Sequence, residues 1–282
     1  MTALALAAAL LLSVPFLFVL ARRPVLRRLA LRNAARRPRE ALLVVVGSMM
    51  GAAIITGSLV VGDTLDASVR QIARSHLGPV DELVLAADRG EWLELDGRLA
   101  SLPSGSVDGM LPVATLDIAA TSVGRRPPRA APRSQVVGLD FVAARRFGDD
   151  PRSTGISGRT PPLWRAAITT DLAAALAVQP GDAIDVLAYG RRHRLTVYRV
   201  LPRRGVADLW LGFEAEARNV LVGPVTFDRL VAPSRSRHAE RFAPPGWAVA
   251  VSNRGGVEGG AGLTDAVKGE IVARTADLEA QV

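Results

Sequence analysis

Two long uncharged apolar runs flank a short arginine-rich segment, and this arrangement constrains the fold more than any other feature of the sequence. The runs cover residues 2–21 and 41–61, and residues 22–40 between them hold eight arginines. A helix of about twenty residues crosses the roughly 30 Å hydrocarbon core of a bilayer, and short arginine-rich loops stay on the cytoplasmic side. The pattern predicts two transmembrane helices joined by a basic cytoplasmic loop, with residues 62–282 outside the cytoplasm.

The net charge of +8 at first suggests a nucleic-acid-binding protein, but its distribution argues against one. Residues 1–40 have a net charge of +7, and the remaining residues together have +1. Binding to nucleic acid needs basic residues that cluster on the folded domain. The basic excess is therefore a topology signal, and we expect no nucleic-acid partner.

The chain has no cysteine, which excludes disulfides, a lipid-anchored cysteine and a thiolate metal site. The outer domain must therefore be stabilised by its apolar core, which is feasible for its size. We expect the first apolar run to be retained and not cleaved as a signal peptide. No charged residue precedes Arg22, and the run is longer than the apolar region of a signal peptide.

The arginine-rich segment has the pattern of a short amphipathic helix that ends near Pro38. Helical spacing relates Leu26, Leu29, Ala30 and Asn33, while Arg28, Arg32 and Arg36 lie along another face. Such a helix lies on the cytoplasmic membrane surface. Two interpretations stay open: the arginines only fix the orientation of the chain, or the helix also contacts a partner.

The second apolar run contains a small-residue pattern. Gly47 and Gly51 form a GxxxG pair, and Ala53 and Gly57 continue the small residues. Small residues let helix backbones approach closely in a membrane. The pattern predicts that this helix packs against other helices, in this chain or in another.

Residues 62–282 show short strands and helices without a steady β-α alternation. We expect strands over 81–87, 107–123, 134–141, 166–169, 219–223 and 246–253, helices over 63–78, 91–102, 170–178, 226–232 and 263–282, and a hairpin around residues 190–192. This mixture predicts an α+β domain. The first and last of these helices are expected to form stalks at the two ends of the domain.

No motif indicates catalysis or cofactor binding. The sequence lacks the Walker A pattern GxxxxGK[ST], HExxH and GxSxG. His76, His193 and His238 are far apart in the chain, and isolated histidines are more often surface or structural residues than zinc ligands. A solvated turn explains the Asp149-Asp150 pair. We therefore expect no catalytic residue, no cofactor and no metal, and an exported enzyme is the least favoured class.

Several segments resemble the FtsX/MacB-type permeases of ABC transporters. LALRNAARRPREALLVVVGSMMGAAIITGSLVVGDTL is similar to the family's N-terminal signature, a basic amphipathic helix followed by a glycine-containing span. The outer domain resembles the family's periplasmic core domain in GPVDELVL, SLPSGSVDGMLPV, QVVGLD and AAITTDLAAALAVQPGDAIDVLAYGRRHRLTVYRVL. The most specific piece is the PGD turn and hairpin that follow an apolar helix.

The resemblance implies a multi-pass permease subunit in the plasma membrane of a bacterium. Such a subunit has no catalytic residue. An ATP-binding subunit in trans drives its outer domain, for export or for extraction of lipids or lipoproteins, and a second permease subunit completes a homodimer or heterodimer. The expected ATPase-contact residues are Arg27, Arg28, Arg32, Asn33, Arg36 and Arg37.

One point of the resemblance leaves alternatives open. Family members continue from a helix like 263–282 into further spans, whereas this sequence ends at Val282, so the chain matches the N-terminal part of a permease or a shortened one. The alternative function is a membrane-anchored interaction or regulatory module without transport activity.

Overall fold

The computed structural model describes residues 14, 18, 22–124, 126–148, 152–211, 218–235, 241–278 and 280–282. The side chains of residues 26, 27, 30, 31, 63–67, 69–75, 235 and 258 lie outside this description. The chain divides into two compact units, Met1–Ser68 and Val69–Val282. Each unit is described by itself.

The first unit contains helix α2 (Pro24–Arg36) and most of helix α3 (Pro38–Leu77), which are separated by Arg37 alone. A proline at the first position starts each helix, because a proline there loses no intrahelical hydrogen bond. Within α3, the 25 residues Pro38–Gly62 are apolar and long enough to cross a membrane, and none of the helix's most apolar window is buried. The exposed side chains suit a lipid environment.

The prediction of two transmembrane helices ahead of the outer domain is wrong for the part of the chain that the structure describes. Among the described residues, α3 is the one helix with the length and composition of a span. The first apolar run, residues 2–21, lies outside the described residues except for Val14 and Phe18.

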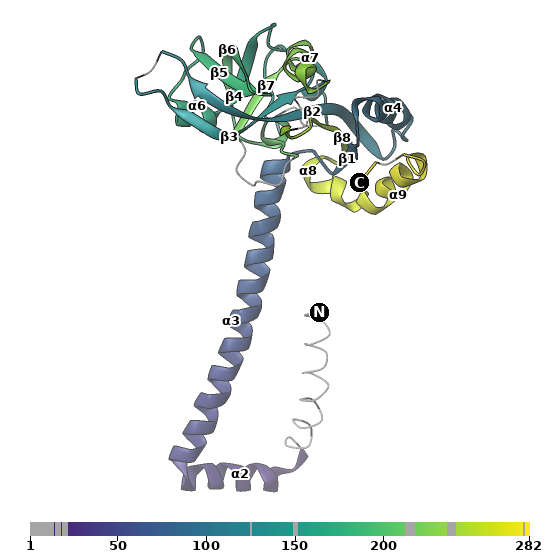
Figure 1. The fold of residues 1–282 in the computed structure, drawn as a ribbon. Coiled ribbons are helices and arrows are strands. Elements are labelled where there is room, and N and C mark those ends of the chain that lie inside the picture. The colour runs from purple at the N-terminus through teal and green to yellow at the C-terminus, as the bar shows by residue number, and fades with distance from the viewer. Residues whose placement is uncertain are drawn as a thin grey trace. The chain divides into compact units, whose positions relative to one another are not determined.

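The second unit is built on one sheet of eight strands in the described residues, in the order β1-β8-β2-β3-β7-β4-β6-β5 (Figure 1). The strands are β1 (Glu82–Ala86), β2 (Val107–Ser122), β3 (Ala130–Gly138), β4 (Arg165–Thr169), β5 (Ala183–Ala188), β6 (Arg191–Leu201), β7 (Arg218–Val222) and β8 (Gly246–Asn253). The pairs β3–β7 and β4–β6 are parallel, and the others are antiparallel. The sheet is therefore mixed.

The long strand β2 closes six of these strands into a barrel. Its first half pairs with β8, its second half pairs with β3, and residues 119–122 pair with β5. The ring β2-β3-β7-β4-β6-β5 thus returns to β2. An irregularity between Ile118 and Ala120 interrupts the β2–β3 register, and such bulges bend a strand and increase its twist.

The predicted α+β domain is therefore wrong, since the structure is a closed, six-stranded, mixed β-barrel extended by β8 and β1. The predicted strand over 107–123 is one continuous strand, with a register shift opposite β8 between Val107 and Gly109. Closure depends on pairings such as Ser134 with Arg218. These pairings join residues far apart in the chain, so local patterns do not show them.

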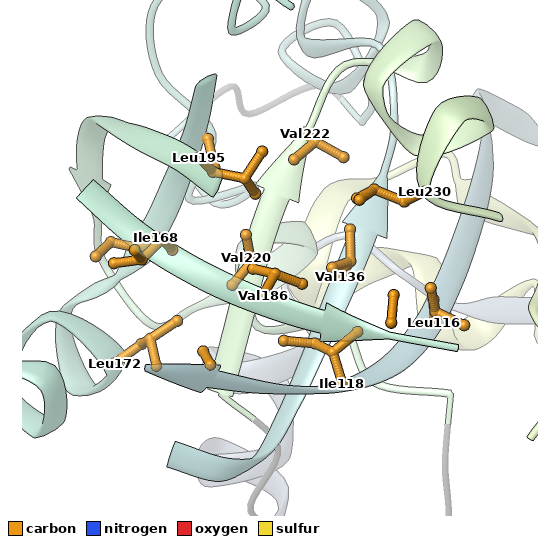
Figure 2. Packing of buried hydrophobic residues seen from close by; sticks show 14 of the residues in the cluster. Leu116, Ile118, Val136, Ile168, Leu172, Val186, Leu195, Val220, Val222 and Leu230 are labelled. Carbon is orange, nitrogen blue, oxygen red and sulfur yellow. The ribbon is translucent and has the colours of Figure 1, made fainter. Parts of the chain in front are cut away.

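Alternation along the strands sorts apolar side chains into the barrel interior and two outer clusters. The interior contains side chains from all six barrel strands, and helices α6 (Thr170–Leu176) and α7 (Pro224–Val231) add Leu172 and Leu230 (Figure 2). A second cluster packs helix α5 (Phe141–Ala144) and the short 3₁₀ helix η1 (Gly205–Asp208) on the outside of the barrel. Buried neighbours in sequence, such as Val220 and Leu221, therefore belong to different clusters.

The third cluster lies where α4 (Arg89–Leu99) and α9 (Thr264–Arg274) pack on β1 and β8. The helix expected over 263–282 is thus an 11-residue helix with Val267 and Ile271 buried against the domain. After it, Gln281 pairs with Leu85 of β1. Three short segments complete the described fold: η2 (Ala232–Arg235), α8 (Gly256–Gly259) and η4 (Gly260–Gly262).

Candidate functional site

Helix α2 presents the arginines that the sequence singles out for contact with an ATPase. Arg28, Arg32, Asn33, Arg36 and Arg37 are all exposed, and the side chain of Arg27 is outside the description. Arg37 pairs with Glu40 at 3.2 Å, a solvent-exposed contact. Spacing of four residues places Arg28, Arg32 and Arg36 on one side of the helix. A partner contact by this side stays a prediction.

The small-residue face of α3 is open in the described chain. An added Cβ at Gly47, Gly51 or Gly57 would meet no atom within 4 Å. The described residues of this chain therefore leave the face unfilled, so the predicted helix packing would need a partner that the structure does not contain.

The end of α3 is fixed within the second unit by a buried carboxylate. Nδ1 of His76, in the last turn of α3, lies 2.6 Å from Oδ2 of Asp208 in η1. Nε of Arg203 donates to the other oxygen of the same carboxylate at 2.7 Å. The Asp208 side chain is only 7% exposed, and the hydrogen bond of a carboxylate to a charged donor such as Arg203 is among the stronger ones.

Glycines complete this contact, which we call the α3 junction and define by His76, Gly78, Ser153, Gly205 and Asp208. Gly78 has φ +60° and ends α3 in the left-handed conformation that glycine adopts without strain. A Cβ on Gly78 would lie 2.6 Å from the Ser153 carbonyl oxygen and 2.7 Å from Gly205 Cα. Backbone therefore packs directly on backbone, with no room for a side chain.

A cavity of about 280 Å³ lies elsewhere on the domain, between α4 and α7 and over β2, β3 and β8. Trp92, Phe227 and Trp247 supply aromatic walls, and Arg89, Asp96, Asp140 and Asp228 supply charges. Ligand pockets are typically about 300–1,000 Å³, mostly apolar with a few polar groups. The volume of this cavity lies just below that range, and its lining has the same composition.

The sequence alone did not reveal the junction or the cavity. The sequence predicts only a surface or structural role for His76, and Asp208 lies 132 residues away from it in the chain. The cavity residues come from six separate elements, α4, β2, β3, α5, α7 and β8. The one local signal was Gly78 at the end of the predicted helix over 63–78. Of the other groups considered, the Asp149-Asp150 pair and His238 lie outside the described residues.

Within the described part of the chain, no group of three or more His, Cys, Asp or Glu side chains is placed to hold a metal ion.

Neither a scan against models of protein families nor a search of curated proteins returned a match for this chain.

Proposed function

We propose that the chain is a membrane permease subunit, or the N-terminal part of one, that works with a separate ATP-binding subunit. In this proposal α3 anchors the barrel domain outside the cytoplasm, and α2 lies on the cytoplasmic side as the contact for the ATPase. ATP hydrolysis by the partner would then move α3, and α3 would move the barrel domain. The output would be export, or extraction of a lipid or lipoprotein.

The observation that carries this proposal is that a single helix holds both the candidate span and the residues of the junction. α3 runs from Pro38 to Leu77 without a proline or a break after its first residue. Its residues 41–61 are uncharged and apolar, with no buried residue in the most apolar window, and its last turn holds His76 against Asp208. A coupling subunit needs such a connection, whereas a simple membrane tether works equally well with a flexible linker.

The construction of the junction supports transmission of movement. Gly78 and Gly205 contact each other through backbone atoms, so no side chain there can change rotamer. Close-packed interfaces of this kind transmit strain. Arg203, which holds Asp208, also lies 3.9 Å from Asp171 at the start of α6, and Arg218 of β7 lies at the same distance from Asp171. A displacement at the end of α3 would therefore reach two elements of the barrel.

Site-specific photo-cross-linking from Asn33 tests the proposal. A photoreactive residue replaces Asn33 in the tagged full chain, which is expressed in its source cells, and cross-linked partners are identified by mass spectrometry. We expect a nucleotide-binding protein with a Walker A motif. The triple change Arg28→Glu, Arg32→Glu and Arg36→Glu should abolish that cross-link. Capture of no ATPase, or equal capture by the triple variant, would refute the assignment.

Two controls make this test specific. Because the triple change removes the charges that set topology, a reporter fused after Gly62 must show that orientation is kept in the variant. The matched control reverses three exposed arginines of the barrel domain, Arg129, Arg159 and Arg165. This control has the same change in charge and should leave the cross-link unchanged.

The second candidate is a membrane-anchored binding module without transport activity. The cavity between α4 and α7 favours it, because a binding module needs a ligand site and no ATPase. Failure of the Asn33 cross-link together with ligand binding in the cavity would select this candidate.

A further inference from the structure

Three aromatic rings form a preorganised wall in the cavity between α4 and α7. The rings of Trp92 and Trp247 are 5.1 Å apart between centroids, and Phe227 meets Trp247 edge to face at 5.9 Å. Nε1 of Trp92 donates to the Ala248 carbonyl oxygen at 2.8 Å, so its polar atom is already satisfied. Phe227 and Trp247 are almost fully buried. The rings therefore keep their positions without a ligand.

A glycine lets Phe227 take its place. A Cβ on Gly138 of β3 would lie 2.6 Å from Cβ and Cδ2 of Phe227. Any larger residue would push the ring away from the sheet. The position of Phe227 in the aromatic wall thus depends on the absence of a side chain at Gly138.

Two of the three carboxylates that line the cavity already have partners within the chain. Asp228 forms a two-point pair with Arg89, with nitrogen–oxygen distances of 3.0 and 3.2 Å. Asp140 accepts from the backbone N–H groups of Val142 and Ala143 and so caps α5. These contacts position the two side chains and neutralise Arg89.

Asp96 is the third carboxylate of the cavity, and it has no partner among the described residues. Its side chain is half-buried, and no described residue donates a hydrogen bond to its carboxylate or pairs with it. Burial raises the pKa of this carboxyl group, as expected for a negative charge that lacks a partner in a partly dehydrated site. A cation placed in the cavity would remove that penalty.

We propose that this cavity binds a small organic cation, an ammonium group carried on a compact apolar body. The ammonium group pairs with Asp96, and the apolar body packs against Trp92, Phe227 and Trp247. Aromatic faces attract cations, and three carboxylates against one arginine leave the cavity negative. An anion would meet Asp96 and two further carboxylates, and a neutral apolar molecule would leave Asp96 unpaired.

The test measures binding of n-butylammonium to the full chain in nanodiscs of phosphatidylglycerol. Isothermal titration calorimetry gives the Kd, and saturation-transfer NMR shows that the ligand contacts the protein. 1-Butanol has the same size without the charge. We expect n-butylammonium to bind at least about tenfold more tightly than 1-butanol, since hydrogen bonds to charged groups contribute more than neutral ones. Equal affinities, or no binding of the ammonium, would overturn the proposal.

Variants at Asp96 assign the effect to this site. Asp96→Asn keeps the shape and removes the charge, and it should weaken n-butylammonium binding at least about tenfold while 1-butanol binding stays the same. Asp96→Glu should restore part of the affinity. Asp265→Asn, at an exposed position of α9, is the matched control and should bind like the original chain. Unchanged binding by Asp96→Asn, with its fold verified by circular dichroism, would place the ligand elsewhere and refute the assignment.

A lipid headgroup could also present an ammonium group, so the titration is repeated in nanodiscs that contain phosphatidylethanolamine. We expect the same affinity, because the proposed ligand is a soluble cation. Competition by the lipid would overturn the assignment to a soluble ligand. The inference does not depend on an ATPase partner, and its outcome leaves the Asn33 cross-linking result unaffected.

Discussion

Replacement of Gly78 by alanine tests whether the α3 junction is as closely packed as the structure shows. At φ +60° a residue with a Cβ is strained, at a cost of about 1–2 kcal/mol. The new Cβ would also lie 2.6 Å from the Ser153 carbonyl oxygen and 2.7 Å from Gly205 Cα. These are backbone atoms that cannot rotate away, and overpacking of this kind costs about 1–3 kcal/mol. We expect Gly78→Ala to destabilise the junction by about 2–5 kcal/mol.

Gly256→Ala is the matched control. Gly256 has φ +65°, but an added Cβ there meets no atom within 4 Å. This variant therefore keeps the backbone strain and the lower entropy of the unfolded chain, without the steric contact. We expect it to cost about 1–2 kcal/mol. The difference between the two variants measures the packing at the junction alone.

Two measurements on the full chain in nanodiscs check the difference. Urea unfolding followed by tryptophan fluorescence reports the stability of the barrel domain, and amide hydrogen exchange around residues 77–80 reports local opening. Gly78→Ala should change at least one of them more than Gly256→Ala does. If both variants behave alike in both measurements, the junction is not closely packed, and the argument that α3 moves the barrel through it fails.

Three further outcomes follow from the domain itself. Burial raises the pKa of Glu82, whose Oε2 has no hydrogen-bond partner among the described residues, so the folded domain retains protons and loses stability as pH rises above about 4.5. Glu82→Gln should therefore stabilise the domain at pH 7 and reduce the change in its urea-unfolding free energy between pH 4 and 7. An unchanged dependence on pH would contradict this. Leu195→Ala, in the barrel interior, should lower the free energy of unfolding in urea by about 2–5 kcal/mol. Leu187 is exposed on the neighbouring strand, and Leu187→Ala should lower it by less than about 1 kcal/mol. Equal losses would be inconsistent with the barrel. Asp140→Ala should cost about 1 kcal/mol through loss of the α5 cap, a change in thermal unfolding that Asp265→Ala should not reproduce.

Local patterns in the sequence predicted several elements of the barrel domain. The hairpin expected around residues 190–192 is β5 and β6, where Ala188 pairs with Arg191 across a two-residue turn. Both turn residues, Tyr189 and Gly190, have positive φ, as this type of hairpin requires. The predicted helix over 63–78 ends where the structure ends α3, because Gly78 is a strong local stop signal.

The barrel and the candidate sites depend on contacts that leave no local trace. The parallel pairing of β3 with β7 joins Ser134 to Arg218, and strand propensity does not choose a partner. β2 reaches β5 only because it is long and irregular at Ile118. Likewise, Asp96 and Asp228 approach the same cavity from different helices, so their relation becomes visible only once the sheet order is known.

The barrel also restricts how other proteins can attach to this chain. Each of the six ring strands pairs with a strand on both sides, so none of them is a sheet edge along its full length. The outermost strand, β1, is blocked at its centre by the two hydrogen bonds between Leu85 and Gln281, at 2.8 and 3.1 Å. Strand addition, which recruits extended peptides to open sheet edges, is therefore closed off here. At the described sheet edge, a protein partner must recognise side chains or displace Gln281, and the same contact protects this edge against edge-to-edge aggregation.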